Sequence, residues 1–446
     1  MHFICALAAL NCGKKRVEEP LNICKYAFRM KNLKSMAAAA CVCALAGCGV
    51  VKENMFATDE SKLWSMGQEL SFFTKYSIDA QILRDGESML VFSPSHQGRV
   101  LTSSYGGEDS PSLGWFNREA LALRKNRDLR RTNIGGEDAF ALGPEGGDTS
   151  IFFEQGVLFS EDNRRIPEIA SAAPWKMVSR SQTQARFECS GELSNALGAK
   201  FKVKAEREIS LLSRGEASKI LGIEIPQTLK MAAFQSMNKL TNIGGEAWSE
   251  KYGMLNMGVK SCFNANNTVN AFIPYRPGDA SKLGDVVRDN VFDSGEGIAL
   301  SRERVEVGGQ FIRFKCDGRH ISGIGVSARR SEGIALSYDD KNSLLTIVLY
   351  IKPSGNRAYF PVSWRNSQAG FDGDAISVFN NGPVAKNIYW ADLFYEISTN
   401  SPALNLAAGK SQFHLQRTFH FHGSEYDLDL IAYKLAGISL KQMRIK

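Results

Sequence analysis

The stretch that decides the fold is QFHLQRTFHFHG, residues 412–423, in which apolar and polar side chains alternate. Successive side chains of a β-strand point to opposite faces of a sheet, so a period of two predicts a strand. One face would carry the apolar side chains Phe413, Leu415, Phe419 and Phe421. The other face would carry Gln412, His414, Gln416, Thr418, His420 and His422, and Arg417 interrupts the apolar face.

Other stretches also predict strands, because they are rich in β-branched and aromatic residues and are bounded by Gly, Asp, Asn or Pro. They are KFKVKAEREISL (200–211), GQFIRFKCDGR (309–319) and LLTIVLYIK (344–352). Residues 427–443 predict a helix packed on the sheet edge, since a polar start precedes apolar residues at helical spacing.

The fold class that follows is mainly β. Strands do not alternate regularly with helices, which argues against parallel α/β folds. No change in composition and no linker divides residues 61–446. A single large antiparallel β-sandwich is therefore the simplest account, and two tightly joined β domains are the alternative.

The net charge of the chain is concentrated near its start. The 446 residues carry 54 Lys and Arg against 47 Asp and Glu, a formal net charge of +7. Residues 1–47 hold seven of the bases and two of the acids, so the remainder has 47 bases and 45 acids, a net +2. A body so close to neutral, without a long basic run, gives no electrostatic support for binding nucleic acid, and no nucleic-acid partner is expected.

Residues 30–47 predict a signal peptide. Basic residues precede an apolar stretch over 36–46 that is too short to span a bilayer. The segment ends in LAGC (45–48), which resembles the lipobox of bacterial lipoproteins, in which the cysteine is lipidated and becomes the new N-terminus. This resemblance implies a membrane anchor on Cys48, a tether over 48–60, and a place in the bacterial cell envelope, on the periplasmic side or the cell surface. Residues 1–29 would then be an over-long start, and the alternative is an ordinary secretory signal with an incidental cysteine.

The body of the chain lacks the common metal and cofactor motifs. Cys189, Cys262 and Cys316 are widely spaced and odd in number, which predicts free thiols instead of a disulfide framework or a zinc site. There is no Walker loop and no HExxH motif, so no cofactor is expected. The HFH at 420–422 places two histidines on one side of a strand, but without a third ligand we expect a solvated or cleft-lining pair, not a metal site.

Glycine-rich polar stretches are the candidates for a binding site. They are HQGRVLTSSYGGEDSPSLGWFNRE (96–119), TNIGGEDAFALGPEGG (132–147) and LFYEISTNSPALNL (393–406). Carboxylates, amides, an arginine and a tryptophan suit a carbohydrate, because hydroxyls accept and donate paired hydrogen bonds and sugar rings stack on aromatic faces. The alternative is that the Gly-Gly-Glu turns are solvated ends of hairpins. The candidate ligand-binding residues are Glu108, Trp115, Arg118, Glu137, Asp138 and Glu145.

Three stretches carry a resemblance to a known family. QGRVLTSSYGGEDSPSLGW, GGEDAFALGPEGGDTSIFF and QRTFHFHGSE resemble a bacterial family of exported and lipid-anchored proteins that is defined only as a domain of unknown function. The similarity extends over most of residues 70–445, and it brings no activity with it.

That family is similar, more weakly, to the galactose mutarotase superfamily, which implies a β-supersandwich that binds carbohydrate on a concave sheet. MNKLTNIGGEAW (237–248) is similar to the mutarotase stretch in which Thr-Asn precedes the catalytic acid histidine, and LFYEISTNSPALNL is similar to the stretch with the catalytic base. The match implies that Glu396 is the base and that Asn242 is the asparagine. Ile243 stands where the histidine should be and cannot transfer a proton, so His420 or His422 would have to replace it.

Three hypotheses follow for the function. In the first, a lipid-anchored protein binds or modifies carbohydrate in a cleft, where Glu137, Asp138 and Glu145 face the ligand, Arg118 neutralises them and Glu396 is the base. In the second, two of the carboxylates cleave a glycosidic bond. In the third, the protein is a scaffold in the envelope, and no cleft lies near Glu145 and Glu396.

Overall fold

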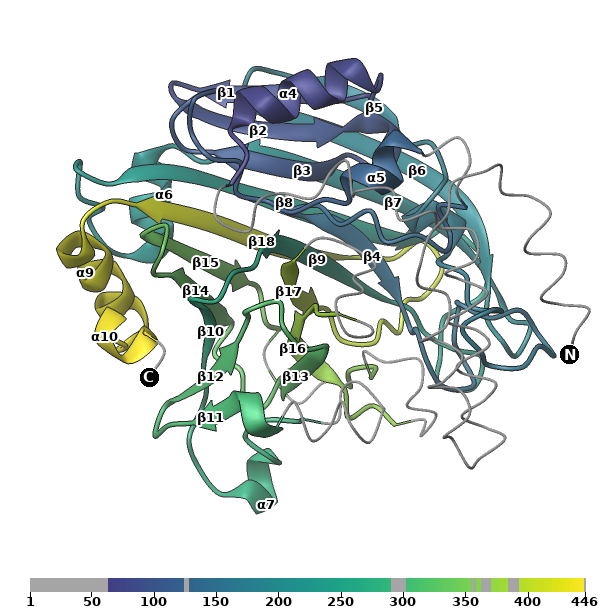
Figure 1. Cartoon of the computed structure of the whole chain (residues 1–446). Coiled ribbons are helices and arrows are strands. Elements are labelled where there is room, and N and C mark those ends of the chain that lie inside the picture. The colour runs from purple at the N-terminus through teal and green to yellow at the C-terminus, as the bar shows by residue number, and fades with distance from the viewer. Residues whose placement is uncertain are drawn as a thin grey trace, which may run out of the picture. The chain divides into compact units, whose positions relative to one another are not determined.

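The architecture was determined as a computed structural model, which describes residues 63–123, 128–289, 302–353, 355, 358–361, 370–383 and 393–444 (Figure 1). The predicted over-long start, signal peptide, tether and Cys48 lie outside the described residues. None of the helices in the described part of the chain is both long enough and apolar enough to cross a membrane.

Three antiparallel sheets form the body of the protein. The largest has ten strands in the order β11-β12-β10-β14-β15-β18-β8-β7-β6-β5. These strands are β5 (Lys176–Arg180), β6 (Gln184–Ser194), β7 (Lys200–Leu211), β8 (Lys230–Asn242), β10 (Val269–Pro274), β11 (Val305–Val307), β12 (Phe311–Lys315), β14 (Ile334–Asp339), β15 (Leu344–Tyr350) and β18 (Ser411–His422).

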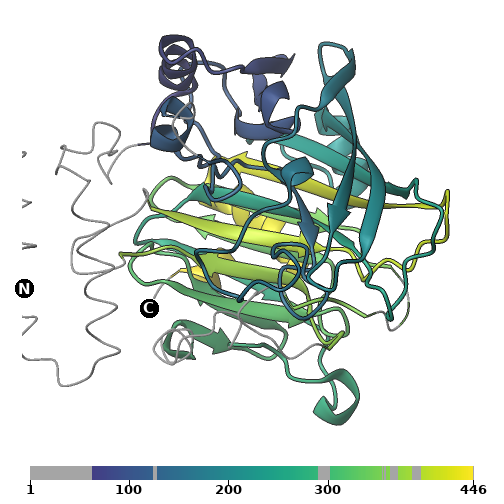
Figure 2. The ribbon, with the colours of Figure 1, turned by 90° about the vertical axis from the view of Figure 1, so that its right-hand side faces the viewer.

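A five-stranded sheet with the order β13-β16-β17-β9-β4 faces the large one. Its strands are β4 (Ala139–Gly143), β9 (Asn256–Asn264), β13 (Ser322–Ser327), β16 (Asp374–Asn380) and β17 (Phe394–Asn400). A three-stranded sheet, β1 (Gln81–Asp85), β2 (Ser88–Ser93) and β3 (Arg99–Ser104), packs on the β7–β8 end of the large sheet. In Figures 1 and 2 this small sheet and helix α4 (Met66–Lys75) lie at one end of the layers, opposite to α7 (Ala280–Leu283).

The remaining helices of the described residues are short. They are η1 (Pro94–His96), α5 (Arg118–Ala122), η3 (Glu168–Ala170), α6 (Arg214–Leu221), α9 (Glu425–Ala436) and α10 (Leu440–Met443). Helices α6, α9 and α10 cover the face of the large sheet that points away from the five-stranded sheet, and they bury Phe419 and Phe421 of β18 (Figure 1). The prediction of a mainly antiparallel β fold with few short helices is confirmed.

The predicted strands all exist, with shorter bounds for two of them. Residues 200–211 form β7 as predicted, whereas 309–319 and 344–352 contract to β12 and β15. The single helix predicted over 427–443 is wrong, because Gly437 adopts a left-handed conformation (φ +66°) that ends α9 and separates it from α10. The two helices also lie over a face of the sheet, not on its edge.

The alternation in β18 is confirmed, but its polar face is not solvated. His414, Gln416, Thr418 and His420 are all buried between the two large sheets. Three of the four have partners across the gap: Thr399 of β17 bonds to both His414 and Gln416, Gln416 donates to Ser261 of β9, and His420 bonds to Glu137. The hydroxyl of Thr418 has no hydrogen-bond partner within the described residues. The middle of the sandwich is therefore a polar layer between two apolar clusters, in which most buried polar groups are paired.

Candidate functional site

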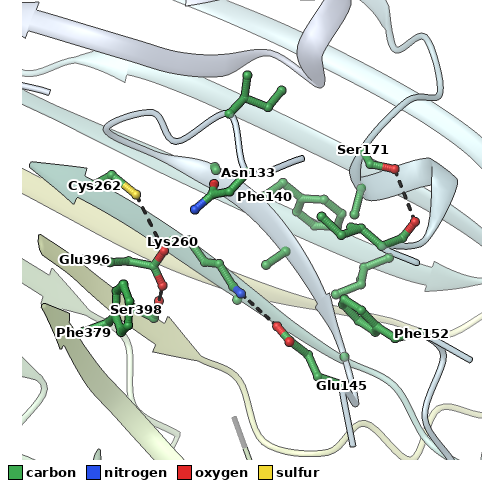
Figure 3. Close-up of a pocket in the computed structure, with 18 of the residues that line it drawn as sticks. Asn133, Phe140, Glu145, Phe152, Ser171, Lys260, Cys262, Phe379, Glu396 and Ser398 are labelled. Atoms are coloured by element: carbon green, nitrogen blue, oxygen red, sulfur yellow. Dashed lines mark hydrogen bonds and ion pairs between the residues drawn. The ribbon is translucent and has the colours of Figure 1, made fainter. Parts of the chain in front are cut away.

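A cavity of about 500 Å³ lies on the outer face of the five-stranded sheet, the face that points away from the large sheet (Figure 3). The strand register explains which side chains reach it. Residues opposite each other on paired strands share a face, and β17 pairs Glu396 with Cys262 and Ser398 with Lys260 of β9. The intervening residues, such as Ile397 and Thr399, point into the sandwich.

Small side chains make the floor of the cavity. Ala139 and Ala141 of β4 lie opposite Lys260 and Gly258 of β9, and all four line the cavity. A side chain at Gly258 would be crowded, because a Cβ atom would lie 2.9 Å from the main-chain carbonyl oxygen of Thr399 and 2.7 Å from Oδ1 of Asn400. The hollow therefore arises where the sheet has little side-chain volume on its outer face.

A carboxylate held by two cations forms one wall. Glu145 accepts a hydrogen bond from Nζ of Lys260 at 2.8 Å (Figure 3). It accepts a second one from Nη2 of Arg164 at 2.9 Å. Burial acts to raise the pKa of Glu145, but the charges of Lys260 and Arg164 outweigh it and lower that pKa to about 2. Glu145 is thus ionised at neutral pH and has no proton to donate.

Glu396 lies beside this ion cluster with a different set of partners. Oε1 accepts from the hydroxyl of Ser398 at 2.6 Å, and the Cys262 thiol donates to Oε2 at 3.6 Å (Figure 3). Burial and the charge of Glu396 raise the pKa of Cys262 well above its usual value, so the sulfur remains a neutral donor. The carboxylate therefore has a weak thiol partner, which a stronger donor on a ligand can replace.

Amides and aromatic rings complete the lining. The amides are Asn133, Asn256 and Asn400, and the phenylalanines are Phe140, Phe152, Phe360 and Phe379. Phe379 pairs with Glu396 in the sheet register, so an aromatic face and a carboxylate are neighbours on the same surface. This combination of an apolar face with convergent polar groups is typical of a site for a small polar ligand.

The stretch TNIGGEDAFALGPEGG contributes to the cavity in two places. Residues 132–135 form part of its wall, and β4 with Glu145 forms part of its floor and rim. Residues 137 and 138, in contrast, turn into the interior of the sandwich, and neither lines the cavity.

The expectation that Glu137 and Asp138 face the ligand is therefore corrected. Glu137 is fully buried, where it accepts from the hydroxyl of Ser103 at 2.7 Å and lies 2.7 Å from Nε2 of His420. Asp138 is also fully buried, and it is paired with Arg207 and with the hydroxyl of Ser236. Both acids hold the layers together.

Arg118 does not neutralise these acids. It forms a buried ion pair with Glu69 of α4, at the end of the molecule that carries the three-stranded sheet. Trp115 is also buried, and its ring stacks on Phe394 with centroids 4.0 Å apart. Neither residue lines the cavity, because each packs one element against another.

The remaining expected ligand residues lie elsewhere as well. Glu108 is exposed and pairs with Arg84 at 3.5 Å. Asn242 is buried, and its Nδ2 donates to the main-chain carbonyls of Glu246 and Leu406, so its role is to fix a turn.

The two histidines of the HFH stretch are not a proton donor pair in the cavity. His420 is buried with Glu137 and Thr346, and His422 stacks on Tyr105 with centroids 4.9 Å apart. Neither lines the cavity. Within the described residues no three His, Cys, Asp or Glu side chains are grouped so that they could hold a metal ion.

Sequence reasoning missed most of the lining. It identified Glu145 and Glu396 but not Arg99, Arg164, Lys260, Cys262 or the three asparagines. The stretch NMGVKSC (256–262) does place Asn256, Gly258, Lys260 and Cys262 on one face of a strand, and this pattern was available in the sequence. The partner strands were not, because pairing of β9 with β17 and β4 joins segments more than a hundred residues apart.

Comparison with known proteins places most of the chain in one family. Residues 64–446 match the model of a family described as a family of unknown function (DUF6786). No curated protein matches the chain.

The chain is similar to several solved structures at low identity. A protein from Escherichia coli K12 described as a "Putative aldose 1-epimerase" has a TM-score of 0.47 and 10% identity, over 77% of this chain and 99% of that chain. A galactose mutarotase-like protein from Lactobacillus casei has a TM-score of 0.44 and 10% identity, over 77% and 100%. A galactose mutarotase related enzyme from Lactobacillus acidophilus has a TM-score of 0.42 and 11% identity, over 77% and 97%.

Proposed function

We propose that this chain, which belongs to that family of unknown function, binds a carbohydrate in the cavity on the five-stranded sheet and that Glu396 is its main acceptor for sugar hydroxyls. One observation carries the proposal: the strand register gathers Glu396, Ser398 and Asn400 beside Phe379 on one surface of a cavity of about 500 Å³. The volume lies in the range of small-molecule sites, and the mixture of acceptors, amides and an aromatic face suits a sugar ring.

Chemistry beyond binding would rest on Glu396 and Lys260. Glu396 can accept a proton from a hydroxyl, since its partners are a hydroxyl and a thiol, neither of them charged. Burial acts to lower the pKa of Lys260, but the charges of Glu145 and Glu396 outweigh it and keep that pKa raised. Lys260 therefore stays protonated and can stabilise negative charge on a ligand oxygen, but its raised pKa makes it a poor proton donor, and Ile243 cannot take that role either.

Glycoside cleavage by a pair of carboxylates receives less support. It requires one carboxyl group that is protonated at neutral pH, and Glu145 is kept ionised by Lys260 and Arg164. The scaffold hypothesis receives less support still, because a cavity is present and Glu145 and Glu396 both line it.

The lipid anchor on Cys48 is part of the same proposal. Its support is the LAGC stretch and the basic and apolar residues before it. It would hold the carbohydrate site in the bacterial cell envelope, on the periplasmic side or the cell surface.

Calorimetric titration of the full chain in mild detergent with neutral, amino and acidic sugars tests the carbohydrate proposal. Glu396→Gln keeps the size of the side chain and should weaken binding at least tenfold, since a hydrogen bond to a charged group contributes about 1.5–3 kcal/mol. Glu192→Gln is the matched control, because Glu192 lies on β6 of the large sheet, is 45% exposed and pairs with Lys200. Absence of binding by every sugar, or equal loss in both variants, would contradict the proposal.

A further inference from the structure

Arg99 is a buried cation whose guanidinium makes no ion pair with a carboxylate of the described residues. It is the first residue of β3, is 7% exposed, and lines the cavity. Its one hydrogen bond within the described residues runs from Nη1 to the main-chain carbonyl of Gly135 at 2.5 Å, and its buried Nε has no partner. A guanidinium has five N–H donors, so this residue is far from satisfied by the protein.

The backbone is shaped to admit this side chain. Gly136 adopts a φ of +107°, and a Cβ atom there would lie 2.9 Å from Cγ and Cδ of Arg99. Gly135 adopts a φ of +70°, which other residues rarely adopt, and its carbonyl is the group that orients the guanidinium. The two glycines of TNIGGED thus make the space in which Arg99 reaches the cavity wall.

The charges around the cavity leave one cation in excess on its inner wall. Glu145 is shared by Lys260 and Arg164, which leaves Glu396 as the second acid beside Arg99. The lining also includes Glu161 and Arg131, which pairs with Asp162 at 3.5 Å, so four lining cations face three lining carboxylates. The neighbouring Arg207 does not change the balance, because it is neutralised by Asp138 inside the sandwich.

An unpaired buried charge is costly, and the effect is visible on Arg99. Burial lowers the pKa of Arg99 to about 10, against the attraction of acidic groups that include Asp138 and Glu396. An anion bound in the cavity would pair with this guanidinium and offset its loss of hydration.

We propose that the occupant of the cavity is an acidic saccharide, whose carboxylate, phosphate or sulfate group lies on Arg99 while its ring lies against Phe379 and the amides. The inference rests on the proposed carbohydrate function and names its substrate class. Neutral sugars would leave the excess cation unpaired, so the acidic group is the source of specificity.

Paired titrations of the full chain test this directly. The dissociation constant of D-galacturonate is compared with that of D-galactose, and that of D-glucuronate with that of D-glucose. D-glucose 6-phosphate and D-glucose 6-sulfate are compared with D-glucose in the same way. These comparisons together show whether a carboxylate, a phosphate or a sulfate binds most tightly. We expect the parent protein to bind one acidic form at least tenfold more tightly than its neutral partner. That preference should shrink as NaCl rises from about 50 to 500 mM, because salt screens the contact.

Variants assign the preference to Arg99. Arg99→Gln should reduce the preference for the acidic form to less than threefold, measured as the ratio of the dissociation constants of the neutral and acidic partners in the same variant. Lys200→Met is the matched control for the change in net charge, because Lys200 lies on β7 of the large sheet, is 71% exposed, and should keep the preference. If Arg99→Gln does not fold, the parent protein and Lys260→Met carry the test, and Lys260→Met should lower the preference several-fold.

The outcomes separate the two proposals. Equal binding of acidic and neutral partners by the parent protein overturns the acidic specificity and leaves the carbohydrate function standing. Acetate or inorganic phosphate binding as tightly as the acidic sugars overturns the saccharide as occupant. Absence of binding by all sugars overturns both.

Discussion

At the scale of single residues, Glu137 and Asp138 show that burial gives an acidic side chain a structural role instead of a ligand-binding one. Both follow a glycine pair that sequence patterns associate with a solvated turn, yet both are fully buried. Asp138 pairs with Arg207, which also donates to Oδ1 of Asn238 at 2.6 Å. Removal of either partner of such a buried ion pair destabilises the fold, because the remaining charge is neither paired nor hydrated.

Replacing Asp138 by Asn should therefore destabilise the fold strongly. The substitution keeps the shape but leaves the buried charge of Arg207 unpaired, with an expected loss of about 3–5 kcal/mol in the free energy of unfolding. Urea denaturation at neutral pH measures the change. Glu192→Gln, which breaks an exposed pair with Lys200, should cost less than about 1 kcal/mol. A similar small loss for Asp138→Asn would contradict the structural role of the pair.

At the scale of elements, the edge of the five-stranded sheet contains a second buried acid. Asp374 begins β16 and is 3% exposed, and its carboxylate lies over Gly325 of the neighbouring β13, where a Cβ atom would be 2.1 Å from Oδ2. Arg288 lies 3.5 Å from Oδ1. Burial raises the pKa of Asp374 to about 7 despite this cation.

This raised pKa predicts a dependence of stability on pH. Between about pH 4 and pH 7 the folded state keeps a proton on Asp374 that the unfolded state has released, so stability falls as the pH rises, by at most about 1.4 kcal/mol per pH unit. His414 acts in the opposite direction, since burial lowers its pKa from 6.5 to about 4. The test therefore compares the free energy of unfolding of the parent with that of a variant at each pH.

Asp374→Asn should remove the contribution of Asp374 to the pH dependence of stability and leave that of His414 in place. Relative to the parent, the variant should gain stability steadily from pH 4 to pH 7 and keep that gain above pH 7. Urea denaturation at half-unit pH steps measures it, with Asp372→Asn as control, because Asp372 is 95% exposed although it also pairs with Arg288. A difference that does not change with pH would show that Asp374 is ionised in the folded protein.

At the scale of the whole molecule, the layers have opposite character on the two sides of the large sheet. The side covered by α6, α9 and α10 is apolar, whereas the side that faces the five-stranded sheet has a polar layer at its centre. The cavity lies outside this sandwich, on the far face of the smaller sheet. The polar layer is thus structural, and the outer face of the five-stranded sheet carries the cavity.

The proposed anchor also belongs to this scale, since it decides where the molecule is held. In a bacterium that processes lipoproteins, the parent chain should incorporate labelled palmitate and sediment with membranes. Cys48→Ser should lose the label and the lipid anchor, because that thiol is the proposed point of attachment. Cys43→Ser removes a cysteine from the same segment and should leave both properties unchanged. Label that persists in Cys48→Ser would exclude Cys48 as the lipidation site.

The sequence by itself determined the local structure, because strand formation depends on the alternation of neighbouring side chains. The stretches at 200–211 and 412–422 became β7 and β18 for this reason. It also identified Glu145 and Glu396, whose glycine-rich and amide-rich surroundings suggested a site. Only the tertiary structure decided that the polar face of β18 is buried, and which acids reach the cavity. Those outcomes depend on the pairing of β9 with β4 and β17, which joins distant segments and turns Lys260 toward Glu145 while Glu137 and Asp138 turn inward. An alternation of apolar and polar residues predicts the two faces of a strand, but the packing of the other layers determines which residues or solvent each face contacts.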